Sequence, residues 1–126
     1  MQLILHDDLL LIPVTIVYQG RQFQVPNVVV DTGSATTMIS TDAAAQVGIT
    51  PDPQDILYVV HGIGGTEVVF SRHVDCLQIG KRSVDKFEIE VGKIDTAFDI
   101  NGILGLDFLL QTGAILNLAS LQIDFA

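Results

Sequence analysis

Short apolar runs separated by small and polar residues make up most of the chain, and this pattern predicts β-strands. The runs are rich in β-branched residues and are bounded by Gly, Pro, Asn or Asp. Turns are expected at Gly20, in the glycine-rich stretch 61–65 and in NLASLQ. The expected strands cover residues 9–18, 22–25, 28–31, 37–40, 56–61, 66–79, 84–91, 114–118 and 122–125.

Two short helices interrupt this β pattern. The stretch STDAAAQVGI offers Ser40, Thr41 or Asp42 as an N-cap, then an alanine run, and Gly48 as a stop. The second expected helix covers 106–111, with Gly113 just beyond it. No low-complexity linker divides the chain, so we expect a single, mostly β domain over residues 1–126.

Composition narrows the class of protein. Apolar residues are 48% of the 126, and charged residues are 17%, which excludes a disordered chain. The formal net charge of −9 argues against nucleic acid or an anionic membrane surface as a partner. No apolar run approaches the roughly 18 residues of a membrane-spanning helix. We expect no membrane insertion of this segment.

The N-terminal stretch MQLILHDDLL has no basic region like that of a signal peptide. Cys76 is the single cysteine, so no internal disulfide can form and a reducing compartment is favoured. These features predict a cytoplasmic location. A soluble domain of a longer protein fits them equally well.

One acidic residue stands out because it ends a strand that should be buried. Three valines, 28–30, lead directly into Asp31-Thr32-Gly33. An unpaired buried carboxylate is costly. One interpretation is an ordinary turn, because Asp and Gly favour turns. The other is a functional carboxylate that points into a cleft, with the hydroxyls of Thr32 and Ser34 beside it.

The order of motifs along almost the whole chain resembles that of retropepsins, the single-domain, retroviral-type aspartic proteases. The resemblance is carried by VVVDTGSA, by the HGIGG hairpin, by GILGLDFL before the last helix, and by the final strands ending LQIDFA. It implies a closed acid-protease β-barrel with one or two short helices and one lobe per chain. It also implies a hydrolase that cleaves extended polypeptides between apolar residues and needs no metal or cofactor.

Aspartic proteolysis uses two carboxylates that share one proton. The sequence has one Asp-Thr-Gly; Asp95-Thr96 continues with Ala97, and Gln111-Thr112-Gly113 lacks the acid. The resemblance therefore implies a homodimer in which Asp31 of each subunit meets on the two-fold axis.

The resemblance also assigns roles to individual positions. Thr32 would hydrogen-bond across the dimer axis, and Gly33 would let substrate backbone approach. The hydroxyl of Ser34 could donate to the outer carboxylate oxygen. The second apolar-Gly motif is Ile103-Leu104-Gly105. The flap that covers substrate would be His61, Gly62, Ile63, Gly64 and Gly65.

Two positions depart from the viral pattern. Ala35 stands where viral enzymes have an acid, and Leu106 stands where they have arginine, so both members of an ion pair are replaced together. The stretches MQLIL and LQIDF are expected to interleave between two copies as an interfacial sheet. The alternative is that each pairs within its own subunit.

Other candidate residues carry weaker signals. His73 and Cys76 are three apart on a predicted strand and have no second His/Cys pair, so we expect no metal site. Asp99 and Asp107 are expected to be turn and helix-surface acids, with Asp107 bonded to local backbone. Two other functions remain open: a catalytically weak or inactive dimerisation or peptide-binding module of the same fold, and a small β-barrel that binds an apolar ligand.

Overall fold

The computed structural model describes residues 1–62, 65–94 and 99–126. Strands dominate it, and two short helices, α1 (Thr41–Ala45) and α2 (Leu106–Thr112), accompany them. The strands are β1 (Ile4–His6), β2 (Leu9–Tyr18), β3 (Arg21–Val30), β4 (Met38–Ser40), β5 (Leu57–Gly62), β6 (Gly65–Ile79), β7 (Arg82–Gly92), β8 (Gly102–Leu104), β9 (Ala114–Asn117) and β10 (Gln122–Phe125).

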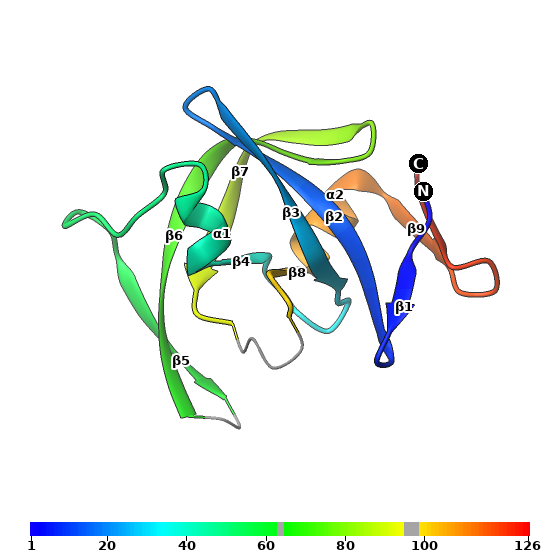
Figure 1. Ribbon diagram of the computed structural model, residues 1–126, viewed down its shortest axis with the longest axis horizontal. Coiled ribbons are helices and arrows are strands. Elements are labelled where there is room, and N and C mark those ends of the chain that lie inside the picture. The colour runs from blue at the N-terminus through cyan, green and yellow to red at the C-terminus, as the bar shows by residue number, and fades with distance from the viewer. Residues whose placement is uncertain (63–64, 95–98) are drawn as a thin grey trace.

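Eight of these strands form one sheet in the order β1-β2-β3-β8-β4-β7-β6-β5. A further pairing of β2 with β6, from Thr15 opposite Gln78 to Val17 opposite Cys76, joins distant strands of this order. The sheet therefore curls into a partly closed barrel, while β5 projects from it together with the start of β6 (Figure 1). This confirms the expected β-barrel with two short helices.

The alternation of apolar residues explains the core. Along β2, Ile12, Val14 and Ile16 are fully buried, and β7 buries Phe87, Ile89 and Val91 in the same period of two. Phe108 of α2 packs edge-to-face on Phe87, with 5.6 Å between ring centroids. This contact fixes α2 against the barrel.

The sequence pattern was wrong where it split the third strand in two. β3 is continuous through Pro26 and Asn27, although its pairing with β2 is irregular there: Val28 lies opposite Ile12 and Val25 opposite Val14. Asn27 takes a left-handed conformation with φ of 56°, which lets the chain pass this bulge without leaving the sheet. The pattern also missed β1 and β8, each only three residues long.

The predicted start of the first helix and the predicted end of the second are confirmed, whereas α1 ends at Ala45, three residues before the expected stop at Gly48. Ser40 caps α1, since its hydroxyl oxygen accepts a 3.1 Å hydrogen bond from the amide of Ala43. Gly48 follows with φ of 84°. Gly113 ends α2 in the left-handed conformation, with φ of 63°. In the described part of the chain, no helix has the length and apolar character needed to cross a membrane.

The two ends of the chain lie beside each other (Figure 1). Met1 and Ile123 exchange two backbone hydrogen bonds of 2.9 Å, and the amide of Leu3 donates to Leu121. β10 also pairs with β9. The terminal segments therefore pair within one chain, because β10 offers an edge to the N-terminal residues. The expected interleaving between two copies stays a prediction.

Candidate active site

Asp31 directly follows β3, at the point where the buried strand ends. Its backbone amide donates a 3.0 Å hydrogen bond to the carbonyl oxygen of Leu104, which extends the parallel pairing of β3 with β8 by one residue. Its side chain is partly exposed. The sheet therefore fixes the backbone of Asp31 and leaves its carboxylate accessible at the barrel's edge.

The residues after Asp31 form a tight turn that orients its carboxylate. The Gly33 amide donates a 2.8 Å hydrogen bond to Asp31 Oδ1, and the Ser34 amide donates to the Asp31 carbonyl oxygen at 3.2 Å. A Cβ atom on Gly33 would lie 3.2 Å from that same Oδ1. Glycine is thus suited to this position because it supplies a donor and leaves room for the carboxylate. Thr32 is exposed.

Ser34 does not make the hydrogen bond expected of it. Its hydroxyl donates to the carbonyl oxygen of Thr36 at 2.8 Å, so its single proton is used within the loop and not on Asp31. Ser34 instead links the two loops through its backbone, because its carbonyl oxygen accepts from Leu106 at 2.7 Å. Ala35 is exposed and Leu106 is half-buried.

The second apolar-Gly motif lies against this turn. Ile103 and Leu104 belong to β8, which lies between β3 and β4, and Leu104 is fully buried. Gly105 follows in an extended conformation at the N-cap of α2. A Cβ there would collide with the Thr36 carbonyl and would lie 2.9 Å from the Ser34 carbonyl oxygen. The two loops are therefore in backbone contact, which only glycine permits.

A buried hydrogen-bond network ties the same two loops together. Asp107 accepts from the Thr37 amide at 3.1 Å and from the Thr37 hydroxyl at 2.7 Å. The Thr37 hydroxyl oxygen accepts in turn from the Gly105 amide at 3.0 Å. Asp107 also accepts from the Phe108 amide at 2.8 Å, the local bond that the sequence predicts. The link to Thr37 was missed, although the alternation of Thr37 with Ile39 already marks both as inward-facing.

The glycine-rich hairpin is formed by β5 and β6. Backbone pairing continues from Leu57 opposite Phe70 through His61 opposite Thr66 to Gly62 opposite Gly65. Residues 63–64, and with them the predicted tip residues Ile63 and Gly64, lie outside the described residues, as do Asp95 and Thr96. The hairpin and the Asp31 loop both lie on the lower side of the barrel as drawn in Figure 1.

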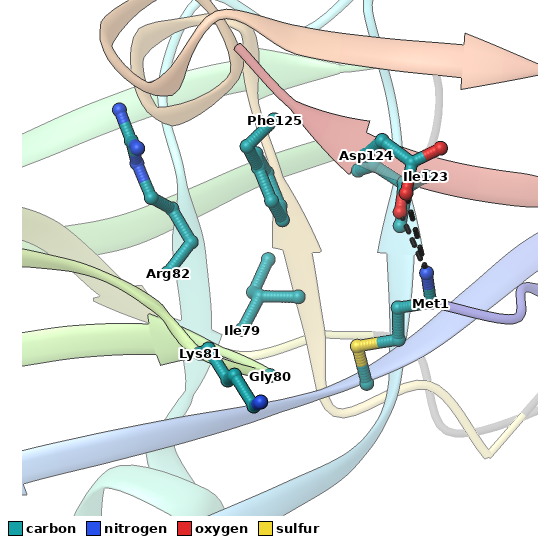
Figure 2. A pocket seen from close by; sticks show the side chains of 8 residues that line it. All are labelled: Met1, Ile79, Gly80, Lys81, Arg82, Ile123, Asp124 and Phe125. Atoms are coloured by element: carbon teal, nitrogen blue, oxygen red, sulfur yellow. Dashed lines mark hydrogen bonds and ion pairs between the residues drawn. The ribbon is translucent and has the colours of Figure 1, made fainter.

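A separate hollow of about 480 Å³ lies at the other end of β6, next to the chain termini (Figure 2). It is lined by residues of the β6–β7 turn and β10, among them Ile79, Arg82 and Phe125. No residue of the Asp31 loop lines it. Across the described ranges, no three His, Cys, Asp or Glu side chains gather in a way that could hold a metal ion.

Comparison with known families identifies the class of protein. Residues 12–108 match the sequence model of a family described as aspartyl protease, and this stretch contains both loops of the site and the β5–β6 hairpin. The chain therefore belongs to the aspartyl protease family of the retropepsin-like kind. A comparison with curated proteins gives no match.

Proposed function

We propose that this protein is a homodimeric aspartic endopeptidase whose catalytic residues are the two Asp31 side chains. The observation that carries the proposal is the setting of Asp31. The Asp31 carboxylate ends a buried strand and is oriented by the Gly33 amide. Its loop is in backbone contact with the Gly105 turn, and the chain belongs to the aspartyl protease family.

The chemistry needs one ionised and one protonated carboxylate. The ionised Asp31 takes a proton from a water molecule, whose oxygen attacks the carbon of the scissile peptide bond. The protonated Asp31 of the other subunit gives its proton to the peptide oxygen. The Asp31 that took the water proton then gives it to the leaving nitrogen as the carbon–nitrogen bond breaks. One hydroxyl of the tetrahedral intermediate returns its proton to the other Asp31, which leaves a carboxylic acid and restores the starting pair. Two adjacent carboxylates share one proton, because their two negative charges would repel each other if both were ionised.

The remaining residues of the site would position substrate and subunits. Thr32 would hydrogen-bond across the two-fold axis, and Gly33 would let substrate backbone pass close to Asp31. An extended substrate would lie between the Asp31 loops and the β5–β6 hairpins, with His61 and the glycine-rich tip above it, and would pair as an added strand. Apolar pockets would then select apolar side chains.

Exposed apolar side chains in the segment that follows the Gly105 turn support a dimer. Leu110 of α2 is 71% exposed, Ile115 of β9 is 55% exposed and Leu118 is 64% exposed. In the sequence they come after the Gly105 turn, which is in backbone contact with the Asp31 loop. Burial of these side chains (Leu110, Ile115 and Leu118) against a second copy would remove apolar area from water and stabilise a dimer.

The test compares the parent protein with Asp31→Asn. Both are incubated with a diverse peptide pool from about pH 4 to about pH 8, because general acid–base catalysis depends on pH, and the products are read by mass spectrometry. Asn keeps the shape of the side chain but cannot exchange the proton, so we expect cuts from the parent only. Asp85→Asn, which changes an exposed carboxylate of β7, is the control and should cut like the parent.

Cleavage that survives Asp31→Asn would refute the catalytic assignment. A folded parent that cuts nothing across this pH range would favour the peptide-binding module instead. Sedimentation at micromolar concentration tests the dimer separately, since a monomer holds only half of the proposed carboxylate pair.

A further inference from the structure

A half-buried arginine on β6 contacts β2 and the loop that precedes β5. The side chain of Arg72 is 19% exposed. Its guanidinium carbon lies 5.4 Å from the ring centre of Phe70 and 5.9 Å from that of Tyr18, so two aromatic rings flank the charge. Nη1 donates a 3.1 Å hydrogen bond to the Tyr18 hydroxyl.

The other guanidinium nitrogen binds the segment that leads into β5. Nη2 lies 2.8 Å and 3.0 Å from the two carboxylate oxygens of Asp55, and 3.2 Å from the carbonyl oxygen of Thr50. The Asp55 side chain is only 9% exposed. Burial by itself would lower the pKa of Arg72, but the hydrogen bonds and electrostatic interactions with Tyr18 and Asp55 outweigh this effect and raise the pKa. The guanidinium therefore stays charged.

Asp55 also organises its own loop. Its carboxylate accepts a 2.6 Å hydrogen bond from the Asp52 amide, and its amide donates to the Asp52 carbonyl oxygen at 2.9 Å. Residues 52–55 thus form a small turn that is closed by its own hydrogen bonds, and Arg72 attaches this turn to the sheet. β5 begins two residues after Asp55.

Apolar burial does little to hold the start of β5. Ile56, Leu57 and Val59 are 69%, 60% and 58% exposed, and β5 is the last strand of the sheet. A strand at an edge with exposed side chains opens easily. The attachment of its base therefore depends on the polar contacts of Arg72.

We propose that the Arg72–Asp55 ion pair positions the β5–β6 hairpin and thereby controls how tightly the protein holds an extended polypeptide substrate. This inference rests on the proposed endopeptidase function. Arg72 and Asp55 are positioning residues, because they contact the base of the hairpin and not the Asp31 loop. Lysine would not replace Arg72, since an ammonium lacks the planar face that contacts the two rings and the second nitrogen that reaches Tyr18.

The first measurement is hydrogen exchange of the intact protein, which needs no substrate. Asp55→Asn keeps the shape of the side chain and removes its charge. We expect backbone amides of β5 to exchange about tenfold faster than in the parent, as local opening allows, while β9 and β10 exchange at the parent rate. Arg72→Met and Arg72→Lys should accelerate β5 at least as much.

The control is Glu88→Gln. Glu88 pairs with His73, the neighbour of Arg72 on β6, at 3.4 Å, but both side chains are more than half exposed. Loss of such an exposed pair should leave exchange in β5 unchanged. The double variant Asp55→Asn with Arg72→Met should open β5 no more than Arg72→Met alone, because Asp55 acts through Arg72.

Equal acceleration of all strands in Asp55→Asn, with a lower melting temperature, would mean that the pair only stabilises the barrel and would overturn the inference. Unchanged exchange in β5 would overturn it too. Because this readout is independent of cleavage, it decides the inference even if the parent proves inactive.

The second measurement uses a peptide that the parent cleaves. Asp55→Asn should raise KM severalfold and change kcat by less than twofold, since the hairpin contacts the ground state and the transition state alike. A fall in kcat with unchanged KM would instead place the ion pair in the chemical step and would contradict the proposed role.

Discussion

The hydroxyl of Thr37 donates a 2.7 Å hydrogen bond to Oδ1 of Asp107, a residue 70 positions further along the chain. Thr37 is fully buried, and its hydroxyl oxygen also accepts from the Gly105 amide. The Thr37 side chain, which follows the Asp31 loop, thus bonds both a carboxylate and an amide of the Gly105 turn and α2. The position of Asp31 relative to the Gly105 turn depends on it.

Thr37→Val should therefore destabilise the protein strongly. Valine has a similar shape but leaves the Gly105 amide without a partner and removes one donor to Asp107, at a cost of about 2–4 kcal/mol in the free energy of unfolding. Urea denaturation measures this change. Thr36→Val alters an exposed neighbour and should change the free energy of unfolding by less than about 0.5 kcal/mol. Equal effects of the two substitutions would contradict the network.

Gly105→Ala should prevent the two loops from packing together. The new methyl group would meet the backbone of Thr36 and Ser34, which cannot move aside as a flexible side chain can. We expect a loss of more than about 4 kcal/mol or failure to fold, seen in the melting temperature and circular dichroism.

Gly20→Ala provides the comparison for this glycine. Its Cβ would meet open space, but φ is +80°, so the cost should be about 1 kcal/mol of backbone strain. A well-folded Gly105→Ala protein as stable as Gly20→Ala would show that the close contact between the loops is not required.

Ile115→Asp should weaken the proposed dimer without unfolding the subunit. Ile115 is mostly exposed in the single chain, so a charge costs little there, but it would be desolvated in the interface. We expect sedimentation to show a monomer and peptide cleavage to fall with it. Ile56→Asp introduces the same charge at an exposed apolar residue outside the proposed interface and should sediment like the parent. A dimer that persists in Ile115→Asp would place the contact elsewhere.

Cys76 should react slowly with thiol reagents. Partial burial on β6 raises the pKa of its thiol, and the carboxylates of Asp85 and Asp75 add to the rise, while a hydrogen bond with Ser83 opposes it. A raised pKa means less thiolate at any given mildly alkaline pH, and thiolate is the reactive form. Iodoacetamide labelling near pH 8 should be slower than for an unstructured cysteine peptide, and should reach the peptide's rate in denaturant. Equal rates in the folded protein would show an unperturbed thiol.

Most of the barrel could be predicted because the alternation of residues within each strand and the capping residues of each helix are visible in short stretches of sequence. The alternation in 9–18 and 122–125 gave strands β2 and β10 with their observed bounds, and Ser40 and Gly113 marked helix ends. The continuous β3 could not be predicted, since Pro26 and Asn27 locally favour a turn and only pairing with β2 and β8 keeps the strand together.

The sequence predicted which residues belong to the candidate site, but not the hydrogen bonds that connect them. Asp31, Gly33 and Gly105 carry recognisable motifs, whereas the role of Asp107 depends on Thr37, which no short stretch of sequence places beside it. The hydrogen bond of Ser34 was mispredicted for a similar reason: a nearby carbonyl oxygen of its own loop competes for its proton. The Arg72–Asp55 pair was also missed, because it forms only when the loop before β5 folds back on β6.

The pairing of the chain ends has a mechanical consequence. Met1 and Ile123 lie at the open end of an antiparallel pair, so tension applied through the two termini would load its hydrogen bonds one after another instead of all together. Such a pair unzips at low force. A pull on the ends would first peel the N-terminal residues from β10, and the strands that hold Asp31 would remain unloaded until that peeling was complete.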